Sequence, residues 1–461
     1  MTRHWLTNLN GYDVHRTIVD EPLTSQTLQA QVAFGKDVPR RHRTARRTEP
    51  RKRKADRMRV RALLQGAFPS PRKRRKRSNA MASNPSERSP RPLISDATLR
   101  DSAHMAGVEF TPADATVIAS LLVRTGVELV EVGMVSGPDS KDADLVLATH
   151  EAVGPERSMT LLVVRDRQQV ARALDEAERL GVRHIMYSIP TSEQHARLKL
   201  GTPSAKFLHT LARSAIGQAK DRGFHVTFSG EDGARTPRER LVPYVTAGFE
   251  AGADRFRLAE TVAYLSPWQM EEVIGDITAI DGSEIEIHSH NMLGMAVANS
   301  LAAVRAGARW ISATVGGIGE RGGNAPLAEL LTSLRILHDD TRFDLSHLTE
   351  LSRVALRGSG LGEAFQSGPT SPHAFAYELP GQLIHPEAYE TLAAELVGNS
   401  RELRVRSRLT TALVKWALDG SGLLVDVDAF TPWLTERQGR DGDPLLDRDA
   451  IRKAAVDFQS V

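Results

Sequence analysis

Residues 284–324 read EIEIHSHNMLGMAVANSLAAVRAGARWISATVGGIGERGGN, and this stretch decides the fold. Its first segment, Glu284–His290, alternates apolar and polar side chains as a β-strand does. A helical stretch follows at 295–306, ends at Gly307, and leads into a second short apolar run, Trp310–Val315. A strand, a helix and a strand at this spacing predict one unit of a parallel α/β sheet.

The same unit recurs back to Pro92. Short apolar runs predict strands at Leu93–Ser95, Leu129–Val132, Met159–Val164, His184–Ile189, His225–Ser229, Arg255–Leu258, Glu284–His290 and Trp310–Val315. Helical stretches follow most of them, at 112–125, 140–152, 167–180, 203–222, 237–251, 267–279, 295–306 and 325–338. Eight such units in about 250 residues predict a (β/α)8 TIM barrel. The alternative, a doubly wound sheet, usually has fewer strands and a glycine-rich first turn.

Charge divides the chain into regions. Residues 1–80 hold 21 Lys or Arg and 6 Asp or Glu, whereas the remainder holds 39 and 51. We therefore expect a disordered basic tail at 1–90, the barrel at 91–345, and linker and helical C-terminal subdomains at 346–461. The tail has two interpretations: an arm that binds nucleic acid, or the product of a start codon placed before a true start at Met81.

Composition excludes several classes of site. The chain has no cysteine, which rules out disulfides, a zinc–thiolate site, an iron–sulfur cluster and a cysteine nucleophile. No apolar run approaches the roughly 18–20 residues of a membrane span. We expect a cytoplasmic protein without a membrane partner. The body is mildly acidic, so nucleic acid is an unlikely partner there.

Polar clusters fall at the ends of four predicted strands. They are Asp96–Asp101 after the first strand, Ser229–Asp232 after the fifth, His288 with His290 on the seventh, and the glycine-rich run 316–324 with Asn324 after the eighth. Each cluster alone has an ordinary explanation: an ion pair, a helix N-terminus, hydrogen-bonded histidines or a plain loop. Because active sites of TIM barrels lie at the C-terminal ends of the strands, their coincidence predicts an active site.

These motifs resemble the family of isopropylmalate synthase, homocitrate synthase and HMG-CoA lyase. Asp96-Ala97-Thr98-Leu99-Arg100-Asp101 is similar to the family's Asp-Thr-Thr-Leu-Arg-Asp/Glu. The stretch His288-Ser289-His290-Asn291-Met292-Leu293-Gly294 is similar to its His-x-His-Asn-Asp-x-Gly, with Met292 in place of the usual Asp. Residues 317–324 match its Gly-x-Gly-Glu-Arg-x-Gly-Asn in full, and Phe228-Ser229-Gly230-Glu231-Asp232 resembles the synthases' Phe-Ser-x-Glu-Asp. The resemblance covers about residues 92–400.

The resemblance implies a role for each matching residue. Metal ligands would be Asp101, His288 and His290, with Asn324 close by, holding Mn²⁺, Mg²⁺, Co²⁺ or Zn²⁺. The catalytic residues would be Arg100, which stabilises an enolate or carbonyl oxygen, Glu231 as part of an acid–base pair, and His373 as its partner. In the synthases that histidine reaches in from the other subunit, so the resemblance implies a homodimer. Ser229 and Thr261 would contact substrate.

The implied reaction joins acetyl-CoA, the co-substrate, to a small 2-oxo acid. Homocitrate synthases carry an arginine for the distal carboxylate of 2-oxoglutarate where this chain has Thr227, and His104 stands where their first motif continues differently. These departures favour a shorter acid such as oxaloacetate, phosphonopyruvate or phosphinopyruvate, as in the related phosphinomethylmalate and phosphonomethylmalate synthases of antibiotic biosynthesis. The alternatives are a homocitrate synthase, a lyase of the HMG-CoA type, and a nucleic-acid-binding protein that uses the basic arm.

Overall fold

The computed structural model describes residues 91–461 except 106, 139, 165, 363–367, 379, 387–389, 391, 406–408, 442–444 and 461. The tail predicted at 1–90, with Met81, lies outside the described residues. Within them, no helix is both long and apolar enough to cross a membrane.

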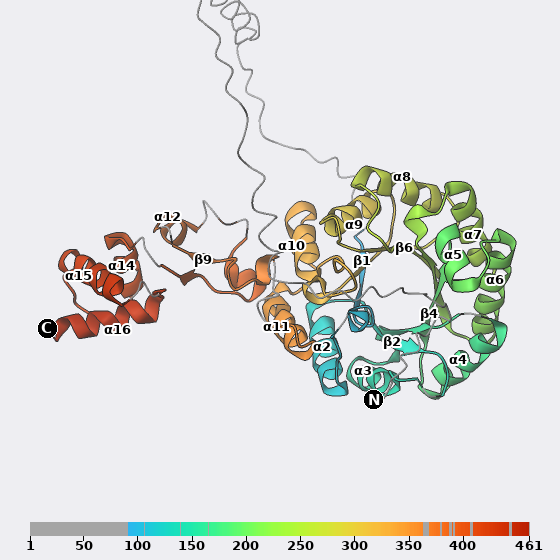
Figure 1. The fold of residues 1–461 in the computed structure, drawn as a ribbon, viewed down its shortest axis with the longest axis horizontal. Helices are drawn as coiled ribbons and strands as arrows, with labels where there is room; N and C mark the ends of the chain where they lie inside the picture. The colour runs from blue at the N-terminus through green and yellow to red at the C-terminus, as the bar shows by residue number, and fades with distance from the viewer. Residues whose placement is uncertain are drawn as a thin grey trace, which may run out of the picture. The chain divides into compact units, whose positions relative to one another are not determined.

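Eight parallel strands close into a barrel in chain order, with β1 paired to both β2 and β8. The strands are β1 Leu93–Leu99, β2 Leu129–Val135, β3 Ser158–Leu162, β4 His184–Pro190, β5 His225–Glu231, β6 Arg255–Glu260, β7 Ile285–Ser289 and β8 Trp310–Ala313. Figure 1 shows the ring of helices around them. The predicted TIM barrel is confirmed.

The helices of the barrel follow the predicted spans to within a few residues. They are α2 Pro112–Thr125, α3 Ala143–Val153, α4 Arg167–Arg179, α5 Glu193–Leu200, α6 Ala205–Asp221, α7 Arg238–Glu250, α8 Pro267–Thr278, α9 Ala296–Arg305 and α10 Leu327–His338. Helix α2 shows why the local signals worked: Thr111 and Asp114 form a capping box, and Gly126 ends the helix at φ 101°. Helix α5 was not predicted.

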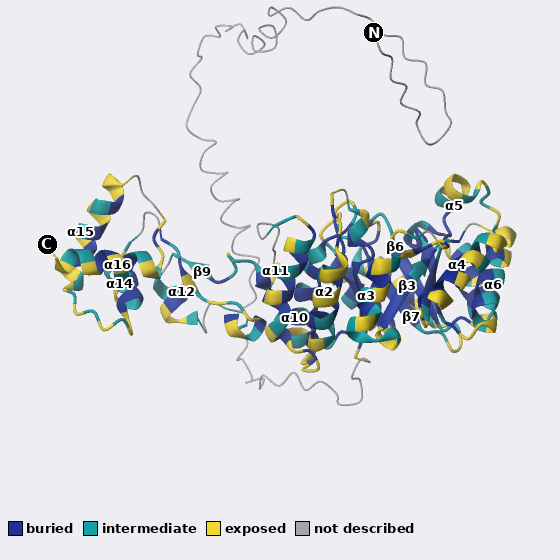
Figure 2. Cartoon of the chain, turned by 90° about the horizontal axis from the view of Figure 1, so that it is seen from below, coloured by how far each residue is buried: buried dark blue, intermediate teal, exposed yellow. Residues whose placement is uncertain are grey.

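The inside of the barrel has an apolar floor and a charged layer above it. Leu129, Met159, Met186 and Trp310 form the floor. Above them, glutamates and arginines from strands that are not neighbours in the sheet meet across the lumen, as the ion pair between Arg257 of β6 and Glu131 of β2 shows. Figure 2 shows the strands as buried and the helices as buried on one side only.

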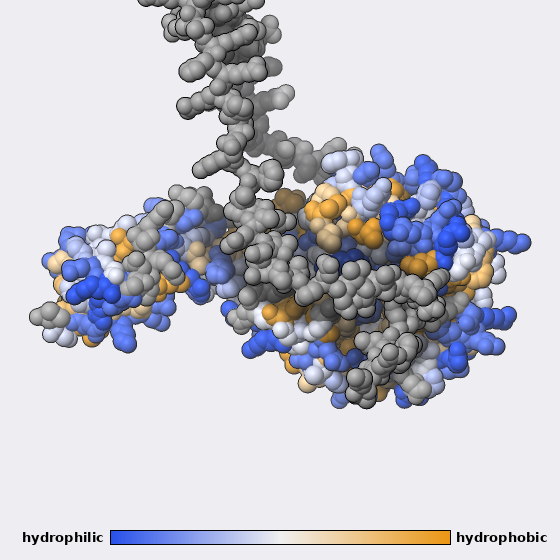
Figure 3. Space-filling model, viewed as in Figure 1, coloured by the Kyte–Doolittle hydropathy of each residue, from blue (hydrophilic) through white to orange (hydrophobic). Residues whose placement is uncertain are grey.

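Hydrophilic side chains cover most of the outer helices. On the face drawn in Figure 3, hydrophobic residues occur in small groups among them. This is the pattern of amphipathic helices that bury one side against a sheet.

The main apolar core of the protein lies between the strands and the helices of the barrel. Helix α11 (Leu348–Gly358) packs into this core, which continues along the chain to Val397. A second core is built from α12 (Pro380–Ile384), α14 (Thr411–Leu418), α15 (Val427–Arg440) and α16 (Arg448–Gln459). The short strands β9 (Ala376–Tyr377) and β10 (Glu402–Leu403) pair in parallel. The boundary at residue 345 stays a prediction.

Two helical glycines give a matched test of the packing. A methyl group at Gly248 in α7 would lie 2.2 Å from the ring of Phe228 on β5, whereas one at Gly217 in α6 would meet nothing within 4 Å. We expect Gly248→Ala to lower the free energy of unfolding by about 1–3 kcal/mol through overpacking. Gly217→Ala should raise it by about 0.5–1 kcal/mol because alanine is the better helix former. Urea denaturation of both variants checks this, and equal effects would contradict it.

Asp96 gives the fold a pH dependence. Its side chain is fully buried, and burial followed by the nearby charge of Glu131 raises its pKa from 3.8 to about 7, against hydrogen bonds from Thr98. The pKa of Asp96 is higher in the folded protein than in the unfolded chain. Its contribution to the free energy of unfolding is therefore fully present below about pH 4 and is lost as the pH rises through 7. The isosteric Asp96→Asn variant should therefore be more stable than the wild type at pH 8, by up to about 4 kcal/mol.

Below pH 4 that advantage should vanish, because Asp96 is then neutral in both states. Chemical denaturation at pH 5, 6.5 and 8 measures the trend. The exposed Asp144, replaced with Asn, serves as the control and should show none. If the stability advantage of Asp96→Asn over the wild type does not grow with pH, the pKa of Asp96 is not raised in the folded protein.

Candidate functional site

The end of β1 brings two charged side chains to the mouth of the barrel. The strand turns after Leu99 into a short 3-10 turn, Ser102–His104, and the backbone N–H of Asp101 donates to the carbonyl of Ala97 at 2.7 Å. Arg100 and Asp101 are both buried and form an ion pair with each other.

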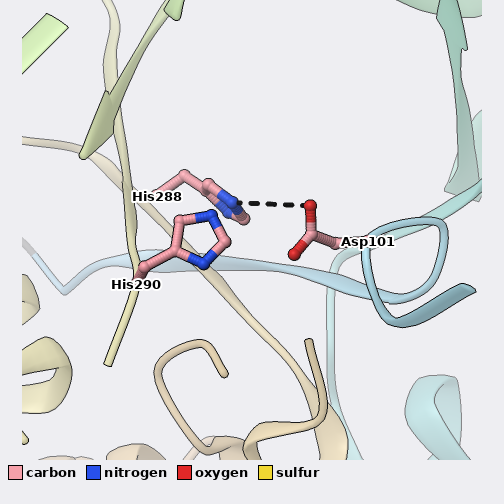
Figure 4. A group of neighbouring side chains, drawn as sticks. All are labelled: Asp101, His288 and His290. Carbon is pink, nitrogen blue, oxygen red and sulfur yellow. Dashed lines mark ion pairs between the residues drawn. The ribbon is translucent and has the colours of Figure 1, made fainter. Parts of the chain in front are cut away.

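The end of β7 supplies two imidazoles. His288 and the residue two positions on, His290, point to the same side, and their ring centroids lie 5.0 Å apart at 88°. Nε2 of His288 lies 3.9 Å from Oδ1 of Asp101. One ligand atom from each of the three residues falls within 4.8 Å of the others. Figure 4 shows both rings and the carboxylate turned toward one another.

Hydrogen bonds behind the rings orient these imidazoles. Nδ1 of His290 lies 3.2 Å from the carbonyl oxygen of Gly323, which can only accept, so Nδ1 carries the proton, and the lone pair of Nε2 accepts from Nη2 of Arg321 at 3.0 Å. Nδ1 of His288 lies 3.0 Å from Oγ of Ser312. Burial lowers the pKa of both histidines, so they are neutral near pH 7. A neutral imidazole fixed in this way is the form that binds metal.

Asp101 is ionised. Burial opposes its charge, but the guanidinium of Arg100 holds the pKa of this carboxyl well below its usual range. The side chain therefore offers an anionic oxygen between two neutral nitrogens.

The loop after β8 completes the set of donors. Asn324 forms an antiparallel bridge with His290, and its Nδ2 donates to Oδ2 of Asp101 at 2.6 Å. Its Oδ1 is buried and has no hydrogen-bond partner among the described residues. A methyl group at Gly319 would clash with Nδ2 of Asn324, so a larger residue there would displace this amide. One carboxylate, two imidazoles and a free amide oxygen suit a divalent cation, so these residues could hold one.

A cavity of about 730 Å³ opens above this group. It is lined by most of the residues predicted for the site: Arg100, Asp101, His104, Ser229, Glu231, Thr261, His288 and His290. His104 is exposed and, with Asp101 and Glu320, forms a second group spaced to hold a cation. Thr261 accepts a hydrogen bond from the backbone N–H of Asp232 at 2.9 Å.

Three predicted residues do not line the cavity. Asn324 lies behind Asp101, as described above. Thr227 is fully buried one inward position below Ser229, and its hydroxyl has no partner within the described part of the chain. His373 is exposed, and its role from a second subunit stays a prediction.

Helix α5 carries two functional candidates that sequence reasoning missed. His195 and Lys199 stand one turn apart and both bond Glu231: Nδ1 of His195 lies 2.7 Å from Oε1, and Nζ of Lys199 lies 2.9 Å from Oε2. Both side chains line the cavity. The signal was present as a His and a Lys four residues apart after the N-cap Ser192.

Two charged residues inside strands were also missed. Glu131 on β2 accepts from Nε of Arg100 at 2.9 Å and pairs on its other oxygen with Arg257 of β6. Arg257 pairs in turn with Glu286 at 2.7 Å. A charged residue in an otherwise apolar strand was the available signal, because such residues are buried only when paired.

Comparisons with known proteins agree with this geometry. Residues 91–355 match the HMGL-like family. The chain is 33% identical to 2-phosphonomethylmalate synthase of Streptomyces rubellomurinus over 72% of this chain and 88% of that protein. It is 31% identical to 2-isopropylmalate synthase of Sulfurisphaera tokodaii over 80% and 95%, and 37% identical to homocitrate synthase of Methanopyrus kandleri over 68% and 78%.

Solved structures show the same fold. The HMG-CoA lyase of Brucella melitensis aligns with a TM-score of 0.51 at 18% identity, covering 59% of this chain and 99% of the lyase. That of Pseudomonas aeruginosa aligns with a TM-score of 0.51 at 15% identity, over 60% and 97%. From the sequence match over more than half of the chain, and from synthases that align along most of their own length, the chain belongs to the HMGL-like family.

Proposed function

We propose that this protein is a metal-dependent acyltransferase that condenses acetyl-CoA with a small 2-oxo acid. The observation that carries the proposal is the group of Asp101, His288 and His290 at the floor of a cavity, with Arg100 beside it. The relatives support it, because three of them are named as synthases of substituted malates or of homocitrate.

The chemistry has four steps. A base removes a proton from the acetyl methyl group, the resulting carbon forms a bond to the keto carbon of the acid, and the keto oxygen takes a proton. Water then cleaves the thioester, which gives a carboxylate and the free thiol of CoA. A divalent cation, when bound, supplies Lewis-acid activation of the keto group.

Arg100 is positioned to stabilise the negative charge that develops on the enolate oxygen. Its Nε and Nη2 are held by Glu131 and its Nη1 by Asp101, so the guanidinium is fixed at the cavity wall before substrate arrives. A fixed cation in a site with little water stabilises an enolate more than one that must reorganise.

Glu231, which lines the cavity, is the proposed base or acid. Its contact with His195 gives it a proton partner in the same chain. The predicted partner His373 would have to come from a second copy, so a homodimer belongs to the same proposal. A cytoplasmic location likewise remains a proposal.

The shorter acids, oxaloacetate and phosphonopyruvate or phosphinopyruvate, are the proposed acceptors, with a place in antibiotic biosynthesis. Resemblance to the phosphonomethylmalate synthase and the absence of an arginine at Thr227 support them. Homocitrate formation from 2-oxoglutarate and cleavage of the HMG-CoA type are the other candidates within the family.

A CoA-release assay tests the proposal. Free thiol is measured from acetyl-CoA with pyruvate, 2-oxoisovalerate, oxaloacetate, 2-oxoglutarate and phosphonopyruvate, with Mn²⁺, Mg²⁺, Co²⁺ or Zn²⁺ and with chelator. We expect release with at least one acid and its loss in chelator. Cleavage of a 3-hydroxyacyl-CoA without any condensation would favour the lyase. Activity of residues 91–461 alone would separate the enzyme from a nucleic-acid-binding function of the basic arm.

A further inference from the structure

We propose that Arg257, together with Ser188 and Ser229, binds a second anionic group on the 2-oxo acid. This inference rests on the proposed function and deepens it. It assigns the substrate class as a short 2-oxo acid with a phosphonate or carboxylate on its third carbon, and it names the residue that selects it.

The three side chains form one row at one level of the barrel. In the strand register, Ser188 of β4 pairs with Ser229 of β5, which pairs with Arg257 of β6. Residues paired in this way point to the same side of a sheet. All three line the cavity. Two hydroxyl groups beside a guanidinium are donors that match the oxygens of a phosphonate or carboxylate.

Part of the guanidinium of Arg257 is not hydrogen-bonded within the described residues. Its Nη2 serves both carboxylates, Glu131 and Glu286, while its Nε and Nη1 are buried without a hydrogen-bond partner among the described residues. The side chain is 1% exposed. Buried donors in native proteins nearly always have partners, and Arg257 lines the cavity, so an anion bound there would supply the missing partner.

The guanidinium is charged in this setting. Burial opposes the charge, but the carboxylates of Glu131 and Glu286 raise the pKa of Arg257 above its ordinary value. Arg100 and Arg255 add two positive charges to this network, and Asp101 adds the third negative one, so the formal charges of its buried members balance. With a divalent cation bound, the site would be positive. An acid with two anionic groups fits that surplus better than one with a single carboxylate.

Ion pairs connect Arg257 to the proposed metal site. Arg100 and Arg257 hold opposite oxygens of the single carboxylate of Glu131, and Arg100 also holds Asp101. The inferred acid carries its second anionic group one methylene from the keto carbon, as oxaloacetate and phosphonopyruvate do, whereas 2-oxoglutarate places it one carbon further out.

The test compares acids that differ in the second charge. Holoenzyme is assayed for CoA release with phosphonopyruvate, oxaloacetate and the uncharged 2-oxobutyrate, and kcat/KM is obtained for each. The test variant is the charge-balanced Arg257→Met with Glu286→Gln, which removes one cation and one anion and leaves Glu131 paired with Arg100 and Arg255 paired with Glu284. The control is the equally charge-balanced Arg255→Met with Glu284→Gln, which changes a buried arginine on the same strand and its partner, neither of which lines the cavity.

We expect the ratio of kcat/KM for the preferred anionic acid to that for 2-oxobutyrate to fall about 100-fold in the Arg257 variant, mainly through KM. In the control the ratio should stay within about threefold. Calorimetric binding of phosphonopyruvate and oxaloacetate without acetyl-CoA gives a second readout and tells which anion is held.

Two failures are distinguishable. If the wild type releases CoA but prefers 2-oxobutyrate, or if the ratio is unchanged in the Arg257 variant, the inference is wrong and the condensation stands. If the wild type releases no CoA with any acid, the proposed function falls, and this inference with it.

Discussion

Replacing Asp101 with asparagine is expected to lower both Mn²⁺ affinity and CoA release by more than about 100-fold. Loss of a residue that only orients a ligand typically costs 10- to 100-fold, and Asp101 is proposed as a ligand itself. It is also the one ionised group between the two neutral histidines. Isothermal titration with Mn²⁺ and the CoA-release assay measure the two effects separately.

The matched control is Asp144→Asn, an exposed carboxylate on α3. It should change neither quantity. If Asp101→Asn bound Mn²⁺ like the wild type, the metal site would lie elsewhere. If binding were lost while turnover persisted, the metal would not take part in the reaction.

Replacing Glu131 with glutamine is expected to lower the free energy of unfolding by about 3–5 kcal/mol, the usual cost of breaking a buried ion pair from one side. Glu131 is 1% exposed and holds both Arg100 and Arg257. Without its charge, Arg100 keeps only Asp101 and Arg257 keeps only Glu286 as an anionic partner in the barrel interior. Denaturation by urea at pH 7 measures the loss.

Glu109→Gln is the comparison for that experiment. Glu109 also forms an ion pair, with Lys141 at 2.9 Å, but both side chains are largely exposed. Its loss should leave the free energy of unfolding nearly unchanged, because solvent screens the charges of an exposed pair. Equal effects for the two variants would mean that the charged layer does not support the fold.

Local patterns in the sequence were sufficient to predict the barrel. Helix α2 shows this well, because its capping box and the glycine at its end are encoded within sixteen consecutive residues, 111–126. The ends of the strands were also predicted from the sequence, and Asp101, His288 and His290 were assigned to these ends. The rule that active sites lie at the C-terminal ends of barrel strands then placed these residues together, although His288 and Asp101 are far apart in the chain.

Contacts across the lumen of the barrel could not be predicted from local sequence patterns. Alternation along a strand shows which residues point inward, but it does not show which inward residue of β2 meets which one of β6. Glu131 and Arg257 are 126 positions apart, and closure of the barrel with its particular stagger decides that they meet. The same holds for α5, where His195 reaches Glu231 across 36 positions.

The sequence by itself thus determined the fold, the family resemblance and the cluster proposed to bind metal, since each depends on short periodic patterns and on residues at the ends of strands. Only the tertiary structure decided which charges are paired in the barrel interior, and which guanidinium keeps donors free for a ligand. The physical reason is that pairing across a closed barrel is set by strand register and stagger, which are properties of the whole sheet.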